Sequence, residues 1–131
     1  MPSLSKKKYI AWMMYSSWRK ESSFCPALQK EVSFTLKGWN HLIGSGGARK
    51  RMPSDVYRRL KVLPLAKEII EKSTTIQNIK KKNETNYYVL EAFMPVQEKG
   101  LSIYKKIRVI LYEDRAKLIK FLSVMPKKAK E

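Results

Sequence analysis

Hydrophobic and polar side chains alternate along the second half of the chain with the two-residue period of a β-strand. Residues 103–112 show this best, because Ile103, Ile107 and Val109 fall on one side of a strand and Arg108 on the other. Three neighbouring segments are also rich in β-branched and aromatic residues, and turn-like sequences separate the four. Such short connections predict an antiparallel meander. The predicted strands are residues 74–82, 86–96, 102–113 and 117–125.

The first half of the chain follows the helical period instead. Ile10, Met13 and Trp18 lie near one face of a helix predicted over residues 6–22. Packing of this face on a core is the main interpretation, and docking on a partner or a membrane is the alternative. Residues 31–35 fit a short extended segment.

Residues 52–73 carry the clearest helical signal. Ser54 is a good N-cap, and Asp55 suits the positive end of the helix dipole. Pro64 predicts a kink or a break, followed by a second helical run. The positions expected to face the core are Val56, Leu60, Leu63, Leu65, Ile69 and Ile70, and the expected cationic cluster is Arg58, Arg59 and Lys61.

A shorter helix is predicted after Thr35, whose hydroxyl fits an N-cap. This helix would contain Trp39 and His41, and the glycines of 44–47 would end it, because glycine adopts positive φ without strain.

Helical segments followed by strands are typical of an α+β fold, here with N-terminal helices packed on one face of a four-stranded antiparallel sheet. The other face of the sheet is then free to be polar. A chain of 131 residues suggests one domain. We expect residues 1–24 to form an N-terminal helical extension and residues 25–131 to form a single nuclease-like α+β domain.

Charge is the unusual feature of the composition. The chain has 28 Lys and Arg against 11 Asp and Glu, which gives a net charge of +17. A polyanion would neutralise this excess, with nucleic acid as the first interpretation and an anionic membrane surface as the second. The apolar stretch near the N-terminus is interrupted by Ser16 and Ser17 and is too short to span a bilayer. We therefore expect a cytoplasmic protein with no membrane partner.

Several common chemistries do not fit the sequence. One cysteine, Cys25, and one histidine, His41, do not make a zinc site, and the glycines of 44–47 lack P-loop spacing. We expect no metal and no cofactor. One histidine among many cations, hydroxyls and aromatics suits metal-independent RNA cleavage, in which the ribose 2′-OH attacks the phosphate. A lone histidine in a basic protein is also often structural, so the composition leaves both interpretations open.

A series of short motifs favours RNA cleavage over a purely structural role for His41. The motifs are CPAL at 25–28, VSFTLKGWNHL at 32–42, RRLKVLPLAKEII at 58–70, and IRVIL followed by KFLSVM across 107–125. Their order resembles the BECR-type ribonucleases (Barnase–EndoU–Colicin–RelE fold), in particular small phage and bacterial members with an early Gly-x-x-His motif. Residues 38–41, Gly-Trp-Asn-His, would occupy that motif. Residues 1–24 lie outside the match.

The resemblance implies an endoribonuclease that acts on tRNA or mRNA, in some members as a toxin with an antitoxin or immunity protein as its partner. It implies catalytic roles for His41 as acid or base, for Arg58 as a phosphate ligand, and for Ser123 as a polar residue of the last strand. The residues expected to bind nucleic acid are Arg49, Lys50, Arg51, Arg59, Lys106, Arg108, Lys120 and Trp39.

Each assignment has a structural alternative. Arg58 and Arg59 equally fit a solvated helix face, Ser123 an ordinary strand position, and Trp39 a core anchor. At the level of function, the alternative is a noncatalytic basic protein that binds RNA or DNA, which has no need of His41. A third interpretation is an interaction partner of an acidic protein.

Overall fold

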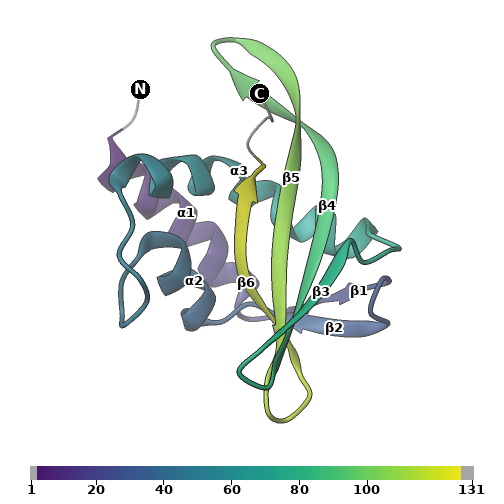
Figure 1. Ribbon diagram of the computed structural model, residues 1–131. Helices are drawn as coiled ribbons and strands as arrows, with labels where there is room; N and C mark the ends of the chain where they lie inside the picture. Colours follow the sequence, from purple (N-terminus) through teal and green to yellow (C-terminus); the bar gives the residue numbers. More distant parts are fainter. Residues whose placement is uncertain (1–2, 128–131) are drawn as a thin grey trace.

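Three helices and a six-stranded mixed sheet make up the computed structural model, which describes residues 3–127 (Figure 1). The α+β class predicted from the sequence is confirmed. The helices are α1 (Leu4–Trp18), α2 (Leu36–Ile43) and α3 (Pro53–Lys72). The strands are β1 (Ser22–Cys25), β2 (Lys30–Ser33), β3 (Asn78–Lys82), β4 (Thr85–Glu98), β5 (Leu101–Glu113) and β6 (Ile119–Pro126).

The predicted four-stranded antiparallel sheet is only part of the observed one. The four strands of the second half form an antiparallel meander, as expected from their alternation. The hairpin β1–β2 extends this meander, because β2 pairs in parallel with β6 and gives the order β1-β2-β6-β5-β4-β3. The expectation of four antiparallel strands is therefore wrong. The extended segment expected over residues 31–35 overlaps β2, but β1 and the pairing of β2 with β6 were not predicted.

Of the three residues expected on the core face of helix α1, only Trp18 is buried. Ala11, Tyr15 and Trp18 are buried, whereas the predicted face residues Ile10 and Met13 are 54% and 57% exposed. Apolar side chains occur all around this helix, so their spacing does not single out one face. The helix packs into the same core as the sheet, and the boundary expected after residue 24 falls inside β1.

Helix α3 continues through Pro64 without a break. Pro64 itself is exposed, so its ring lies outside the core against which the helix packs. The helix starts two residues earlier than expected, because Met52 and not Ser54 occupies the N-cap position and Pro53 opens the first turn. Its buried face contains Val56, Leu60 and Leu63, in agreement with the periodicity.

One edge of β6 is only partly paired, and the helices occupy the rest of it. β2 pairs with Ile119 and Lys120 alone. Farther along, α2 approaches so closely that a Cβ on Gly38 would lie 2.6 Å from the backbone oxygen of Phe121. Glycine is required at this contact because any side chain would collide with the strand. This packing brings α2 and the start of α3 beside the central strands.

Candidate nucleic-acid interface

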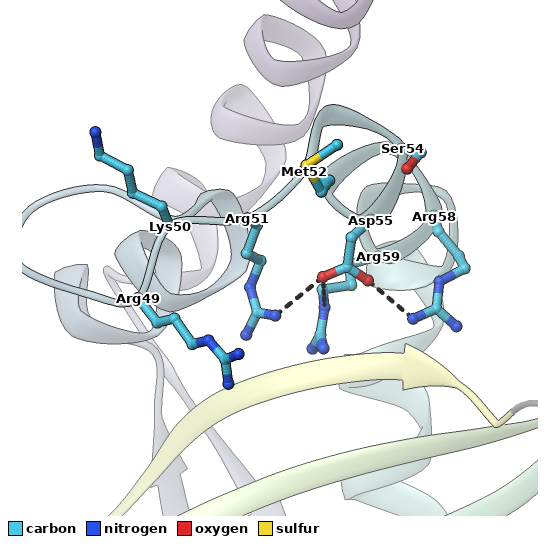
Figure 2. A pocket seen from close by; sticks show the side chains of 8 residues that line it. All are labelled: Arg49, Lys50, Arg51, Met52, Ser54, Asp55, Arg58 and Arg59. Atoms are coloured by element: carbon cyan, nitrogen blue, oxygen red, sulfur yellow. Dashed lines mark hydrogen bonds and ion pairs between the residues drawn. The ribbon is translucent and has the colours of Figure 1, made fainter.

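Asp55, in the first turn of α3, holds three arginines together (Figure 2). One carboxylate oxygen lies 3.0 Å from Arg51 and 3.1 Å from Arg59, and the other lies 2.8 Å from Arg58. Residues three or four positions apart lie on one helix face, which explains why Arg58 and Arg59 reach the same carboxylate. We call Arg51, Asp55, Arg58 and Arg59 the Asp55 cluster.

The electrostatics of Asp55 follow from these contacts. Burial alone would raise its pKa, but hydrogen bonds and positive charge from the three guanidiniums outweigh that effect and lower the pKa to about 2. Asp55 is therefore ionised throughout the physiological range and compensates only one of the three positive charges around it.

The arginines of the Asp55 cluster are also fixed at their other ends. Arg59 donates to the hydroxyl of Ser123 on β6 at 2.6 Å, and Arg58 donates to the backbone oxygen of Pro126 at 3.2 Å. The Pro126 carbonyl is available because the next amide, of Lys127, bonds to β5, and a trans peptide points its carbonyl the opposite way. The guanidiniums of Arg58 and Arg59 thus have set orientations before any ligand arrives.

Together with the neighbouring loop, this cluster forms an open pocket. Within the Asp55 cluster Arg58 is the most exposed arginine, with 36% of its side chain accessible against 12% for Arg51 and 9% for Arg59. Arg49 and Lys50 are exposed and complete a lining with five cations and one carboxylate (Figure 2). The lining residues are Arg49, Lys50, Arg51, Met52, Ser54, Asp55, Arg58 and Arg59.

His41 borders the Asp55 cluster from α2. A terminal nitrogen of Arg51 lies 3.1 Å from Nδ1 of the imidazole, and Nε of Arg51 donates to the His41 backbone oxygen at 2.6 Å. Because a guanidinium only donates, Nδ1 must accept and the ring proton must sit on Nε2. Burial first, and then the charges of Arg51, Arg59 and Lys37, lower the His41 pKa to about 4. At neutral pH this imidazole is an uncharged hydrogen-bond donor through Nε2.

The fold brings five of the predicted residues together from three separate segments of the chain. His41, Arg51, Arg58 and Arg59 meet beside Ser123, whose hydroxyl is fully buried behind Arg59. Arg49 and Lys50 lie at the rim of the same pocket.

Two other residues that were predicted to bind nucleic acid make contacts away from this pocket. Trp39 is 7% exposed and packs against Trp12 and Tyr15, so its ring offers no open face for a base. This environment agrees with the alternative interpretation, in which Trp39 anchors the core. Lys120 pairs with Asp114 at 3.3 Å in the turn between β5 and β6.

The predicted residues Lys106 and Arg108 belong to a second group of charges, around Glu91 of β4. Arg108, directly opposite Glu91 on β5, donates through two nitrogens at 3.0 and 2.8 Å. Lys106 and Lys127 lie 3.8 and 3.7 Å from the same carboxylate. Burial would raise the pKa of Glu91, but Arg108 and the two lysines lower it overall. We call Glu91, Lys106, Arg108 and Lys127 the Glu91 cluster.

Sequence reasoning missed the role of Asp55, which was assigned only to the helix dipole. Arginines at spacings of −4, +3 and +4 around one aspartate were the available signal. Within residues 3–127, no three His, Cys, Asp or Glu side chains gather closely enough to hold a metal ion.

Comparison with protein-family models, with curated proteins and with solved structures finds no match to this chain. None of the helices in the described range is long and apolar enough to cross a membrane. The arrangement of side chains therefore carries the functional argument.

Proposed function

We propose that the protein binds RNA and that the Asp55 cluster, with Arg49 and Lys50, is its primary phosphate site. The observation that carries this proposal is a pocket with five cations, one carboxylate and prearranged guanidiniums. Guanidinium groups match phosphate oxygens with paired hydrogen bonds, and prearrangement lowers the entropy lost on binding. The net charge of +17 adds long-range attraction to a polyanion.

Binding is tested by the fluorescence anisotropy of a short labelled RNA over a range of salt concentrations. We expect Arg58→Ala to weaken binding about tenfold and to reduce the slope of log affinity against log salt by roughly one. Arg115→Ala is the matched control, because Arg115 is an exposed arginine in the turn between β5 and β6. Equal losses in the two variants would mean that only net charge matters and would contradict a phosphate site at the Asp55 cluster.

A second candidate function, metal-independent cleavage of the bound RNA, is favoured by the position of His41. An uncharged imidazole lies 3.1 Å from an arginine of the proposed phosphate site. In this function the phosphate draws the Arg51 guanidinium away from His41, which frees Nδ1 to take the proton of the 2′-OH. The 2′ oxygen bonds to phosphorus and the P–O5′ bond breaks. A water molecule protonates the departing O5′ and takes in return the proton that His41 removed, so His41 is regenerated. The BECR resemblance and the antiparallel meander β3–β6 support this candidate.

Cleavage is tested by incubating wild type and His41→Ala with tRNA and mRNA in EDTA. RNA cutting by wild type that leaves 2′,3′-cyclic phosphate ends, and is lost in the variant, supports the ribonuclease. Binding by both proteins without cutting would leave RNA binding as the function and would overturn cleavage.

A further inference from the structure

The end of the β4–β5 hairpin carries two exposed aromatic side chains. β6 ends opposite Ile107, so the hairpin continues beyond it as a two-stranded ribbon, which projects past β6 in Figure 1. On this ribbon Phe93 is 66% exposed and Tyr104 is 71% exposed. Large apolar side chains gathered on a projecting ribbon are typical of an interaction surface.

The two aromatic rings lie on the same face of the ribbon. Phe93 is directly opposite Lys106, and Tyr104 is directly opposite Pro95, two residues farther along β4. Directly paired residues share a face of the ribbon, and so do residues two positions apart on one strand. Phe93 and Tyr104 are therefore diagonal neighbours on one face, with a residue-to-residue separation of about 7–8 Å. Ile107, one residue beyond Lys106, is fully buried, so the opposite face is the one that continues into the core.

Positive charge accompanies the rings on this face. The Lys106 ammonium lies 5.3 Å from the Phe93 ring centre. Arg108 follows two residues along β5, and it shares Glu91 with Lys106 and Lys127. The Glu91 side chain is only 5% exposed, whereas its three cations are 31–36% exposed. Solvent therefore meets aromatic rings and positive charge, which complement bases and phosphates.

The aromatic face lies close to the Asp55 cluster. Arg58 donates to the backbone oxygen of Pro126, and the amide of Lys127, the next residue, donates to the backbone oxygen of Lys106 at 2.8 Å. Two consecutive residues at the end of β6 thus connect the phosphate pocket to the start of the ribbon. The phosphate pocket and the start of the ribbon are therefore neighbours at this end of β6.

We propose that Phe93 and Tyr104 form a stacking platform for unpaired bases of a single-stranded RNA segment whose backbone is held at the Asp55 cluster. The inference rests on the proposed RNA-binding function and adds the class of RNA. A duplex hides the faces of its bases within its own stack, so it can use the arginines but not the rings. Stacking is tolerant of sequence, because every base has a π face.

The experiment compares a labelled single-stranded RNA with a duplex of the same sequence. We expect Phe93→Ala and Tyr104→Ala each to weaken single-strand binding about fivefold or more and to leave duplex binding unchanged. The matched control is Tyr9→Ala, because Tyr9 is 66% exposed on α1. Circular dichroism melting verifies that all three variants fold. A single-stranded probe that contains 2-aminopurine reports stacking directly, and its fluorescence change on binding should be lost with the rings.

The outcomes separate the two proposals. If wild type binds neither RNA, the proposed function fails and the platform with it. If wild type binds both RNAs but Phe93→Ala and Tyr104→Ala bind the single strand as Tyr9→Ala does, the platform alone is overturned. Equal losses for single strand and duplex would also overturn it, because stacking on unpaired bases requires a difference.

Discussion

The Asp55 and Glu91 clusters have the same composition, one carboxylate with three cations, but opposite arrangements. At Asp55 the carboxylate is 26% exposed, and two of its arginines are only 9% and 12% exposed. At Glu91 the carboxylate is 5% exposed, and all three cations are 31–36% exposed. Buried cations depend on their counterion, whereas exposed cations can turn to water. The first cluster should therefore be the rigid one and the second the adaptable one.

The largest expected effect is that of Asp55→Asn on stability. The change leaves two largely buried guanidiniums without a counterion, so we expect the free energy of unfolding to fall by about 2–4 kcal/mol. Glu91→Gln is the control, with an expected loss of about 1 kcal/mol because its cations can be hydrated. Urea denaturation measures both. Similar losses would contradict the proposed difference between the clusters.

The free energy of unfolding should depend on pH through His41, which is partly buried beside the arginines of the Asp55 cluster. Its pKa is about 4 in the folded protein against an ordinary 6.5, so the unfolded chain binds the extra proton first. The free energy of unfolding should therefore be highest above pH 6.5 and fall by up to about 3 kcal/mol as the pH drops to 4.

Denaturation of wild type and His41→Gln at several pH values tests this slope. Glutamine can still accept a hydrogen bond from Arg51 but does not titrate. We expect the difference in stability between the two proteins to change steadily between pH 6.5 and 4. A constant difference over that range would show that His41 is not desolvated beside the arginines.

The fold was predictable where the hydrophobic pattern is long and one-sided. Strands β4 and β5 alternate over many residues, and α3 presents one apolar face, so all three elements were predicted. Strand β1 is four residues long, and its place in the sheet depends on β2 pairing with β6, almost 90 positions away in the chain. No local pattern encodes such a contact.

The candidate site was predictable as a set of residues but not as a geometry. Arg58, Arg59, His41 and Ser123 were named, and the fold gathers them. The sequence does not show which arginines Asp55 binds or that Arg59 covers Ser123. Both contacts depend on how α3 lies against β6. The pairing of Glu91 with Arg108 depends on a strand register that alternation alone does not fix.

Replacing one arginine of each cluster by lysine should give a smaller contrast. Arg59 bonds Asp55 through one nitrogen and the buried Ser123 hydroxyl through another. A lysine keeps the charge but cannot reproduce this fork, so Arg59→Lys should lower the free energy of unfolding by about 1–2 kcal/mol. Arg108→Lys should change it by about 0.5 kcal/mol or less, because Arg108 is partly exposed. Thermal denaturation compares the two, and equal losses would contradict the ranking.

The smallest expected effect is on RNA affinity, where the two carboxylates should act with opposite sign. Glu91→Gln removes a negative charge from the open face and leaves its cations mobile and free to meet phosphates. We therefore expect a two- to threefold gain in affinity, or about 0.5 kcal/mol. Asp55→Asn removes the same charge but releases the arginines from their fixed orientations, so the folded variant should bind more weakly. Anisotropy titrations below the melting temperature of both variants measure the two shifts. A gain in both would show that net charge, and not the arrangement around Asp55, governs binding.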